Sequence, residues 1–253
     1  MGKLQKSSAR ARSGNGTSPC AECEVRPFNI CKVLLGREGA AQLSRDGRAD
    51  WQAHKKIAAN KIIKAVGEQL DRVYVVCAGW AFRFAQVPNG RRQILSILVP
   101  GDVITPTRPF EDVVSFSVQA LTDVRYCGYS RALLKERLAT ETPLVAAWTD
   151  LIVAERKQNF DLLIDLGSLS AEERVADFVV QLVTRLEQRP ALVEDPLIIP
   201  LPQWLIAAAL GLTPEYVSRV ISTFRQERVI ESRRGLLRVI DPHSLRRIVG
   251  LRA

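Results

Sequence analysis

Residues 202–241 read PQWLIAAALGLTPEYVSRVISTFRQERVIESRRGLLRVID, and this stretch predicts a winged helix-turn-helix. Residues 202–210 form a short apolar helical run, and Gly211 and Leu212 then supply a turn. Thr213 and Pro214 open a second helix, because threonine caps a helix N-terminus and proline suits its first position. Two helices joined by so short a turn are typical of DNA-binding helix-turn-helix units.

The second helix has two faces of different chemistry. Its apolar stripe is predicted to face the domain core and comprises Val217, Val220, Ile221 and Phe224. Its polar face carries residues three or four positions apart, which are neighbours on a helix: Glu215, Ser218, Arg219 and Ser222. Such side chains can read base edges in the major groove, since arginine bonds guanine and glutamate accepts from cytosine.

Two short strands, around 229–232 and 236–240, predict the β-hairpin wing. Arg233 and Arg234 lie at its turn, where we expect them to contact phosphates rather than bases. After Ala207 the chain has nine arginines and four acidic residues. An arginine-rich unit of this kind predicts double-stranded DNA as the partner. The alternative is a winged helix that docks only protein, since a fold does not fix a function.

The chain as a whole has 253 residues, 47% of them apolar, and a formal net charge of +9. The length predicts two domains, and the charge favours an anionic partner. No run of about 18 apolar residues, as a membrane span requires, is present. Residues 1–19 form a flexible basic tail without the apolar core of an export signal. We therefore expect a cytoplasmic protein with reduced thiols and no membrane partner.

Residues 37–142 are predicted to form a sensory β-roll, or jelly roll. Residues 40–64 look helical and carry no chemistry that can be assigned. The short β runs that follow are separated by turn residues such as Asn89-Gly90, as in small antiparallel rolls. They are Val73–Val76, Ala81–Gln86, Gln93–Val99, Val113–Leu121 and Val124–Tyr129.

From Pro143 to Leu166 runs one long helical pattern of about 24 residues, or roughly 36 Å. We interpret 143–168 as a connector and a dimer seam in which the polar Glu155 and Gln158 interrupt the apolar positions. The seam comprises Leu144, Trp148, Leu151, Glu155, Leu162, Leu163 and Leu166, together with Ile152. The alternative is a helix packed within its own subunit. Ser170 and Glu173 resemble a capping box, which opens the DNA-binding domain at 169–253.

The segment 20–36 places three cysteines, Cys20, Cys23 and Cys31, within twelve residues. Thiolates suit zinc or an iron–sulfur cluster, and the spacing alone leaves the metal open. A fourth ligand would be Cys77 or Cys127. Cys77 lies in a strand that is apolar on both faces, which favours a small core residue whose replacement has little effect. The alternation around Cys127 is expected to point its thiol away from the main core.

No enzyme activity and no catalytic residue is predicted. A Cys-x2-Cys pair can be a dithiol redox site, but the thioredoxin-type βαβ pattern is missing. The two histidines, His54 and His243, lie far apart and lack a catalytic neighbourhood. The carboxylates are scattered, and the sequence has no Gly-rich phosphate loop.

The order of β-roll, long helix and winged helix resembles the CRP/FNR superfamily of bacterial transcription regulators, over essentially the whole chain beyond residue 19. LGLTPEYVSRVISTFRQERVIE, residues 210–231, resembles the family's recognition region. CAECEVRPFNIC, residues 20–31, is similar to the Cys-x2-Cys-x7-Cys of the FNR/FnrN/FixK-type branch. The resemblance implies an α+β fold with a cyclic-nucleotide-binding-like β-roll, a long dimerisation helix and a C-terminal winged helix-turn-helix.

The same resemblance implies a 4Fe–4S cluster, labile to oxygen and held by Cys20, Cys23, Cys31 and Cys127. It also implies a homodimer that binds a TTGAT-N4-ATCAA-type palindrome, contacts RNA polymerase and controls anaerobic or microaerobic genes. Loss of the cluster in oxygen would release the N-terminal segment and lower the DNA affinity. A FixK-like or a thiol- or zinc-responsive regulator without a cluster is the alternative.

Cyclic nucleotides are not expected as partners. Members of the family that bind cyclic AMP carry a phosphate cassette with a Gly-Glu pair and a later Arg-Ser/Thr-Ala element. The corresponding stretch here, GDVITPTRPFEDVVSFSVQAL at 101–121, has Arg108 but neither of these elements.

Overall fold

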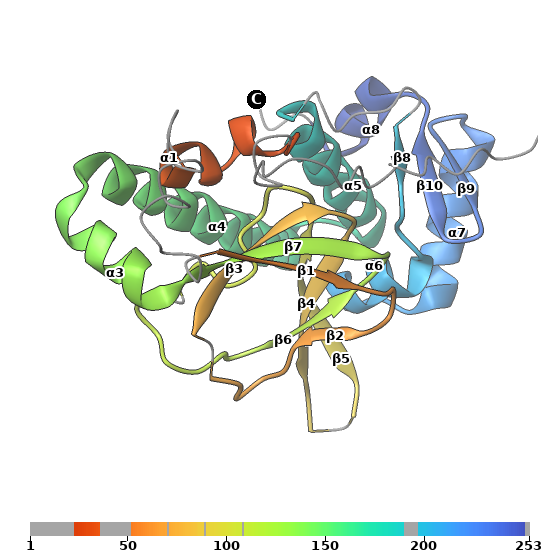
Figure 1. The fold of residues 1–253 in the computed structure, drawn as a ribbon. Helices are drawn as coiled ribbons and strands as arrows, with labels where there is room; N and C mark the ends of the chain where they lie inside the picture. The colour runs from red at the N-terminus through yellow and green to blue at the C-terminus, as the bar shows by residue number, and fades with distance from the viewer. Residues whose placement is uncertain are drawn as a thin grey trace, which may run out of the picture.

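A computed structural model of the chain describes residues 23–35, 52–69, 71–88, 90–107, 109–189 and 197–250. The predicted tail at 1–19 lies outside the described residues, and so do Cys20 and Arg108. The described chain forms a β-rich lobe and a mainly helical lobe, joined by one long helix (Figure 1). This arrangement is the α+β fold that the sequence predicts.

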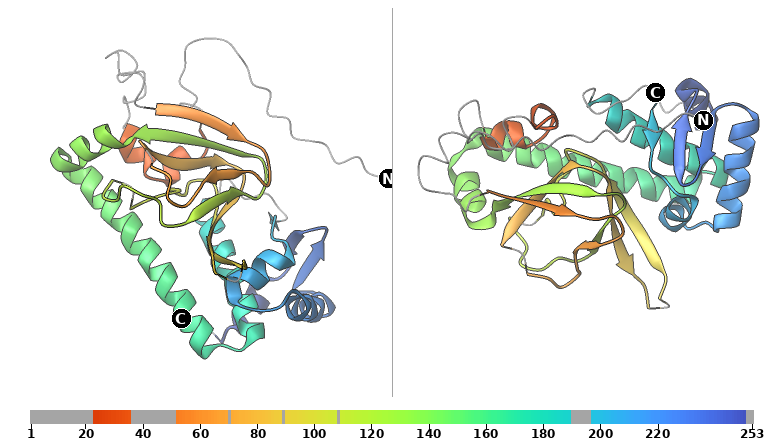
Figure 2. Two further views of the ribbon diagram at one scale, coloured as in Figure 1. Left: turned by 90° about the horizontal axis from the view of Figure 1, so that it is seen from below. Right: turned by 45° about the vertical axis from the view of Figure 1, so that its right-hand side comes forward.

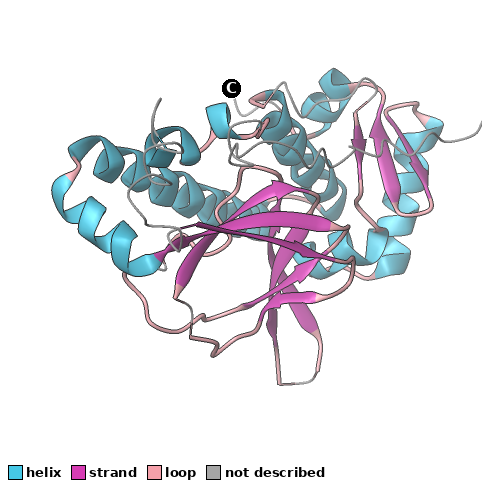
Figure 3. Cartoon of the chain, in the orientation of Figure 1, coloured by secondary structure: helices cyan, strands magenta, loops and turns pink. Residues whose placement is uncertain are grey.

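The β-rich lobe is built from two antiparallel sheets (Figure 3). One sheet has the order β1-β7-β3, and the other has the order β2-β6-β4-β5. Their strands are β1 (Gln52–Ile57), β2 (Ile62–Lys64), β3 (Arg72–Ala78), β4 (Ala81–Gln86), β5 (Arg92–Leu98), β6 (Ser117–Ala120) and β7 (Val124–Ser130). The β runs predicted over 73–129 are therefore confirmed, although only the end of the 113–121 run is a strand.

The predicted helical character of 40–64 is wrong for its described part, which consists of β1 and β2. Both are edge strands, so each is paired on one side only. On β1, His54, Lys55 and Lys56 are all exposed. A strand with this much exposed polar surface lacks the alternation that would have identified it.

Strands β3 and β7 are buried on both faces, and each face contributes to a different core. Tyr74 and Tyr126 face the interior of the roll, where their rings meet edge to face. Val75 and Cys127 are paired across the strands and face the opposite side. This side is covered by helix α1 (Cys31–Leu35) and by the start of the long helix. Cys127 thus points away from the interior of the roll, yet it is buried.

The long helix is α4 (Thr142–Ser168), with 27 residues. It follows α3 (Arg131–Thr140), which the sequence pattern did not reveal. Figure 2 shows α4 running along one side of the molecule, from the β-rich lobe to the helical lobe. Its first turns pack on α1 through Leu144 and Trp148, and the Trp148 indole donates to the Pro106 carbonyl at 3.0 Å.

The helical lobe contains the predicted winged helix-turn-helix. The Ser170–Glu173 capping box is present and opens the first helix of the lobe. A short strand and a C-terminal helix were not predicted: β8 (Ile198–Ile199) completes a sheet of order β8-β10-β9, and α8 packs on α5. The elements of the lobe are α5 (Ala171–Glu187), β8, α6 (Gln203–Leu210), α7 (Pro214–Gln226), β9 (Ile230–Arg233), β10 (Leu236–Val239) and α8 (Pro242–Ile248).

The two lobes share an apolar core. Phe82 and Ile97 of the roll belong to the same buried cluster as the helices of the winged domain. The Phe82 ring meets Trp204 edge to face, and the Gln93 amide donates to the Ala209 carbonyl at 3.0 Å. Among the described helices, none is long and apolar enough to cross a membrane.

Candidate nucleic-acid interface and thiol cluster

Helix α7 is fixed in place by local signals at its start and by its apolar face. Gly211 adopts a left-handed φ of 64° and ends α6. The Thr213 hydroxyl accepts from the Tyr216 N–H at 3.2 Å and so caps α7. The apolar stripe of α7 is buried as the sequence predicts, which turns the other face of the helix outward.

The outward face of α7 carries Glu215, Ser218, Arg219 and Ser222, all of which are exposed. The Arg219 guanidinium lies 5.2 Å from the centre of the Tyr216 ring. This cation–π contact holds the arginine along the helix while leaving its donors free for an acceptor on a partner. Sequence reasoning missed Tyr216, although its i, i+3 spacing from Arg219 is the signal that could have identified it.

The wing turn is a two-residue hairpin loop, since Arg233 pairs with Leu236 across it. Arg234 and Gly235 have positive φ values of 51° and 79°. Positive φ at both loop positions gives the turn a backbone twist that matches the twist of the two flanking strands in a tight hairpin. The turn therefore presents the exposed side chains of Arg233 and Arg234 at the tip of the wing.

The described cysteines gather where the N-terminal segment meets β3 and β7. Cys31 opens α1, and its thiol lies 3.1 Å from the Tyr129 hydroxyl. The Cys127 thiol lies 3.7 Å from the same hydroxyl. Cys31 and Cys127 are only 3% and 1% exposed. Two of the candidate ligands, far apart in sequence, thus share one buried neighbour.

The other two thiols, Cys23 and Cys77, lie at the more open side of this cluster. The hydrogen bond from Cys77 is the main cause that lowers the pKa of Cys23 to about 6. Hydrogen bonds to Cys127 and to Cys23 raise the pKa of Cys77, which therefore stays protonated as the donor. Cys77 is half-buried at the edge of the apolar cluster, so its interpretation as a simple core residue is incomplete.

The donor chemistry of this cluster fits a thiolate-bound metal or iron–sulfur group. Cys23, Cys31 and Cys127 come together on one face of the sheet, and Cys20 precedes Cys23 by three positions. Within the described ranges, however, no three thiol, imidazole or carboxylate groups have the arrangement that would hold a metal ion. The thiols would have to move to bind one.

The residues of α4 that were predicted to form the dimer seam lie in two different environments, the core of the chain and its surface. Leu144 and Trp148 are buried in the chain's own core, which corrects their assignment to a dimer face. Leu151, Ile152 and Leu162 are half-buried, whereas Leu163 and Leu166 are exposed. Sequence reasoning missed further exposed apolar residues from the middle of the helix onward. They are Val153, Phe160 and Ile164.

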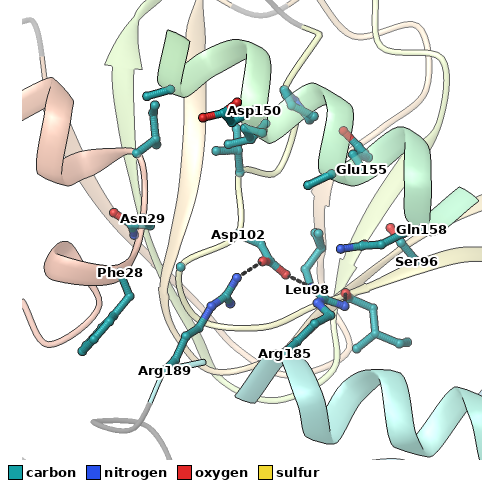
Figure 4. A pocket seen from close by; sticks show the side chains of 18 of the residues that line it. Phe28, Asn29, Ser96, Leu98, Asp102, Asp150, Glu155, Gln158, Arg185 and Arg189 are labelled. Atoms are coloured by element: carbon teal, nitrogen blue, oxygen red, sulfur yellow. Dashed lines mark hydrogen bonds and ion pairs between the residues drawn. The ribbon is translucent and has the colours of Figure 1, made fainter. Parts of the chain in front are cut away.

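The polar seam residues Glu155 and Gln158 line a cavity of about 350 Å³ between the roll, α4 and α5 (Figure 4). Glu155 forms an ion pair with Arg83, which is buried on β4. Their pairing across the chain is a contact within the subunit. Glu155 thus binds a buried arginine of its own subunit, and its predicted role at the dimer seam is corrected.

A buried carboxylate closes the far side of the same cavity. Asp102 lies in the turn after β5 and pairs with both Arg185 and Arg189 of the helical lobe (Figure 4). Burial would raise the pKa of Asp102, but the two guanidinium groups and the Val99 N–H hold it below its ordinary value. The same arginines donate to roll carbonyls, Arg185 to Ile97 and Arg189 to Pro100. Asp102 thus joins the two lobes, and sequence reasoning gave no sign of it.

Two family descriptions match the two lobes. Residues 173–248 match the Crp-like helix-turn-helix domain, and residues 54–141 match the cyclic nucleotide-binding domain. The solved structure of FixK2 from Bradyrhizobium japonicum has a TM-score of 0.70 at 21% identity, over 80% of this chain and 99% of that one. This likeness shows a common fold.

Closer relatives in sequence are regulators. The nitrogen fixation regulation protein FixK of Azorhizobium caulinodans is 32% identical over 76% of this chain and 77% of its own length. A probable transcriptional activator of Rhizobium leguminosarum bv. viciae is 30% identical over 91% of this chain and 93% of its own. CRP/FNR proteins bind DNA, are typically dimeric and are not enzymes. With a matching domain in each lobe and relatives at this identity, the chain belongs to the CRP/FNR family of transcription regulators.

Proposed function

We propose that this regulator responds to oxygen, and that Cys20, Cys23, Cys31 and Cys127 hold a 4Fe–4S cluster when oxygen is low. The observation that carries the proposal is the convergence of Cys31 and Cys127 on the Tyr129 hydroxyl, from segments about 100 residues apart. When bound, such a cluster supplies a group that oxygen can destroy.

The protein's own residues explain how thiol ligation would reach the long helix. Cys31 begins α1, which packs against Leu144 and Trp148 of α4. The Leu34 carbonyl accepts a hydrogen bond of 2.7 Å from Arg137 on α3, just before α4. Fixing the N-terminal segment to β7 through Cys127 therefore fixes the base of α4. Release of the segment would loosen that base.

The proposed output is DNA binding by a homodimer with α4 as its seam. Two copies of α7 would then read half-sites of a TTGAT-N4-ATCAA-type palindrome through Glu215, Ser218 and Arg219, with Ser222 on the same face. Arg233 and Arg234 would contact phosphates. RNA polymerase is the further partner that we expect at the anaerobic and microaerobic promoters.

Replacement of Cys127 tests the ligand assignment. After anaerobic purification, we expect about four irons and four sulfides per wild-type chain, with a visible band that bleaches in air. Cys127→Ser should lose most of the iron and all anaerobic activation, because one of four thiolate bonds is gone. Cys77→Ser is the matched control, since it alters a neighbouring thiol and should keep the iron. Full iron content in Cys127→Ser would refute the four-ligand assignment.

A second candidate is a regulator that binds zinc or responds through its thiols alone, as a FixK-like protein without a cluster. The contact between Cys23 and Cys77 favours it, because it offers thiol chemistry that needs no iron. The same metal analysis separates the two candidates. About one zinc per chain, or no metal in the active protein, would support this second candidate.

Arg219 is the test of base reading. Arg219→Ala should weaken operator binding by roughly 1–3 kcal/mol and relax the preference at one base pair. Arg234→Ala is the control, because loss of a phosphate contact weakens binding to all sequences alike and reduces its salt dependence. Fluorescence anisotropy with the palindrome and with single-base variants measures both effects. Equal losses on every sequence for Arg219→Ala would contradict base reading.

We also propose that the roll does not bind cyclic nucleotides, although its fold matches that domain. A phosphate needs unpaired cationic donors, but the three arginines that line the cavity, Arg83, Arg185 and Arg189, are each paired with a carboxylate. The remaining cation of the lining, Lys32, is exposed to solvent. Isothermal titration with cyclic AMP should therefore give no saturable heat.

A further inference from the structure

The Arg219 guanidinium has two possible partners on its own helix. At about 100° per residue, Glu215 lies roughly 40° from Arg219 around the axis of α7, and Tyr216 lies roughly 60° from it on the other side. Glu215 precedes Arg219 by four positions, the spacing and order at which a carboxylate and a cation pair well on a helix. The guanidinium nevertheless takes the other partner, since it lies 5.2 Å from the centre of the Tyr216 ring.

Glu215 and Arg219 therefore stay apart although both are exposed, and no ion pair joins them in the described part of the chain. Elsewhere the same spacing does produce a pair. At the end of α3, Arg137 donates two hydrogen bonds to the Glu141 carboxylate, of 2.6 and 2.7 Å. The difference on α7 is the aromatic ring beside the arginine.

Tyr216 is anchored at its backbone and open at its side chain. Its N–H donates to the Thr213 hydroxyl at 3.2 Å, and the next residue, Val217, is fully buried in the core of the lobe. The Tyr216 side chain is 37% exposed and does not belong to that core. Within the described ranges, no residue bonds to its hydroxyl. An exposed aromatic ring that contributes no core packing is available to support the arginine beside it.

We propose that Tyr216 determines DNA specificity by holding Arg219 away from Glu215, so that both side chains remain available to read bases. The inference rests on the base reading by Glu215 and Arg219 that is proposed above. An ion pair between them would occupy the arginine donors that guanine needs and the carboxylate oxygens that cytosine needs. The face of an aromatic ring attracts the guanidinium without occupying its N–H donors in a hydrogen bond. Tyr216 acts through Arg219 and is a positioning residue.

The test compares Tyr216→Ala with Tyr216→Phe on the palindrome, on its single-base variants and on unrelated duplex DNA, by fluorescence anisotropy. Arg219→Ala first identifies the base pair that Arg219 reads. At that base pair, Tyr216→Ala should lower the discrimination by about two- to fivefold per half-site, the effect of losing an exposed cation–π contact. Tyr216→Phe keeps the aromatic face and should keep the discrimination. Both variants should bind unrelated DNA as the wild type does.

A double variant shows whether Tyr216 acts through Arg219. Alanine at position 219 leaves no guanidinium for the ring to hold. Tyr216→Ala should therefore have no further effect on the discrimination in the Arg219→Ala background, so that the two changes are not additive. Far-UV circular dichroism of each variant confirms that it is folded.

Equal losses on every sequence for Tyr216→Ala would overturn the proposal, and so would additive effects in the double variant. A loss for Tyr216→Phe on all sequences would also overturn it, because that result assigns the hydroxyl to a phosphate contact. The proposed base reading is judged separately. If Arg219→Ala relaxes one base pair and Tyr216→Ala does not, only the role of Tyr216 fails. If Arg219→Ala weakens all sequences alike, the base reading fails as well.

Discussion

Asp102→Ala is expected to destabilise the protein by about 3–5 kcal/mol, the usual cost of removing one partner from a buried ion pair. Arg185 and Arg189 are less than one-fifth exposed, and each has Asp102 as its carboxylate partner. Without Asp102, two largely buried guanidinium groups lose the carboxylate with which each is paired. Chemical unfolding followed by circular dichroism measures the loss, and limited proteolysis shows whether the lobes separate.

Asp150→Ala is the matched control, because Asp150 lines the same cavity but is exposed to solvent. It should change the stability by no more than about 0.5 kcal/mol. Acid should mimic Asp102→Ala. The pKa of Asp102 is lowered in the folded protein. Its contribution to the free energy of unfolding is therefore fully present above about pH 4, and it is lost as the pH falls through the lowered pKa. Wild-type stability in Asp102→Ala would show that the two arginines find other partners.

The parts of the fold that the sequence predicted are those specified by local signals. The Ser170 capping box, the Thr213 cap and the glycine after α6 each act within a few residues, and all three are present in the structure. The wing turn likewise follows from two adjacent residues. These local signals mark the ends of the recognition helix, and the periodicity of its apolar residues identifies its buried and exposed faces.

The parts that were missed depend on contacts distant in sequence. Asp102 meets Arg185 and Arg189 from 83 and 87 residues away, and no periodicity marks such a pair. Leu144 and Trp148 have the spacing of a dimer seam, but α1 covers them in the folded chain. Edge strand β1 was taken for helix because its polar side chains face outward.

The thiol site was predictable only in part for the same reason. The spacing of Cys20, Cys23 and Cys31 is a local signal that indicated a thiolate site. The position of Cys77 depends on a bulge in its pairing with β7, and one inserted residue leaves no trace in an apolar run. The sequence offered Cys77 and Cys127 as alternatives for a fourth ligand, whereas the structure brings both of them to the site, together with Cys23 and Cys31.

Phe160→Glu should convert the protein to a monomer and lower its affinity for a palindromic operator by about 100-fold or more. Phe160 and Leu163 are 48% and 63% exposed on α4, although both are large and apolar. Val153 and Phe160 are seven residues apart, as are Arg156 and Leu163, which is the repeat of a two-helix seam. The substitution removes the apolar ring from that seam and puts in its place a carboxylate that must be desolvated, although Arg156, whose guanidinium lies 5.0 Å from the Phe160 ring centre, can pair with it. A monomer then reads one half-site instead of two. A loss of about 100-fold corresponds to about 2.8 kcal/mol.

Gln158→Glu is the control for this prediction, because it adds the same charge about 200° around the helix from Phe160, at the cavity within the subunit. It should leave the dimer intact. Light scattering measures the molar mass of each variant, and fluorescence anisotropy compares a full palindrome with a single half-site. On the half-site, Phe160→Glu should bind like the wild type, because α7 is far from Phe160 along the chain and its reading face is unchanged. A dimeric Phe160→Glu protein with full operator affinity would place the seam on another surface.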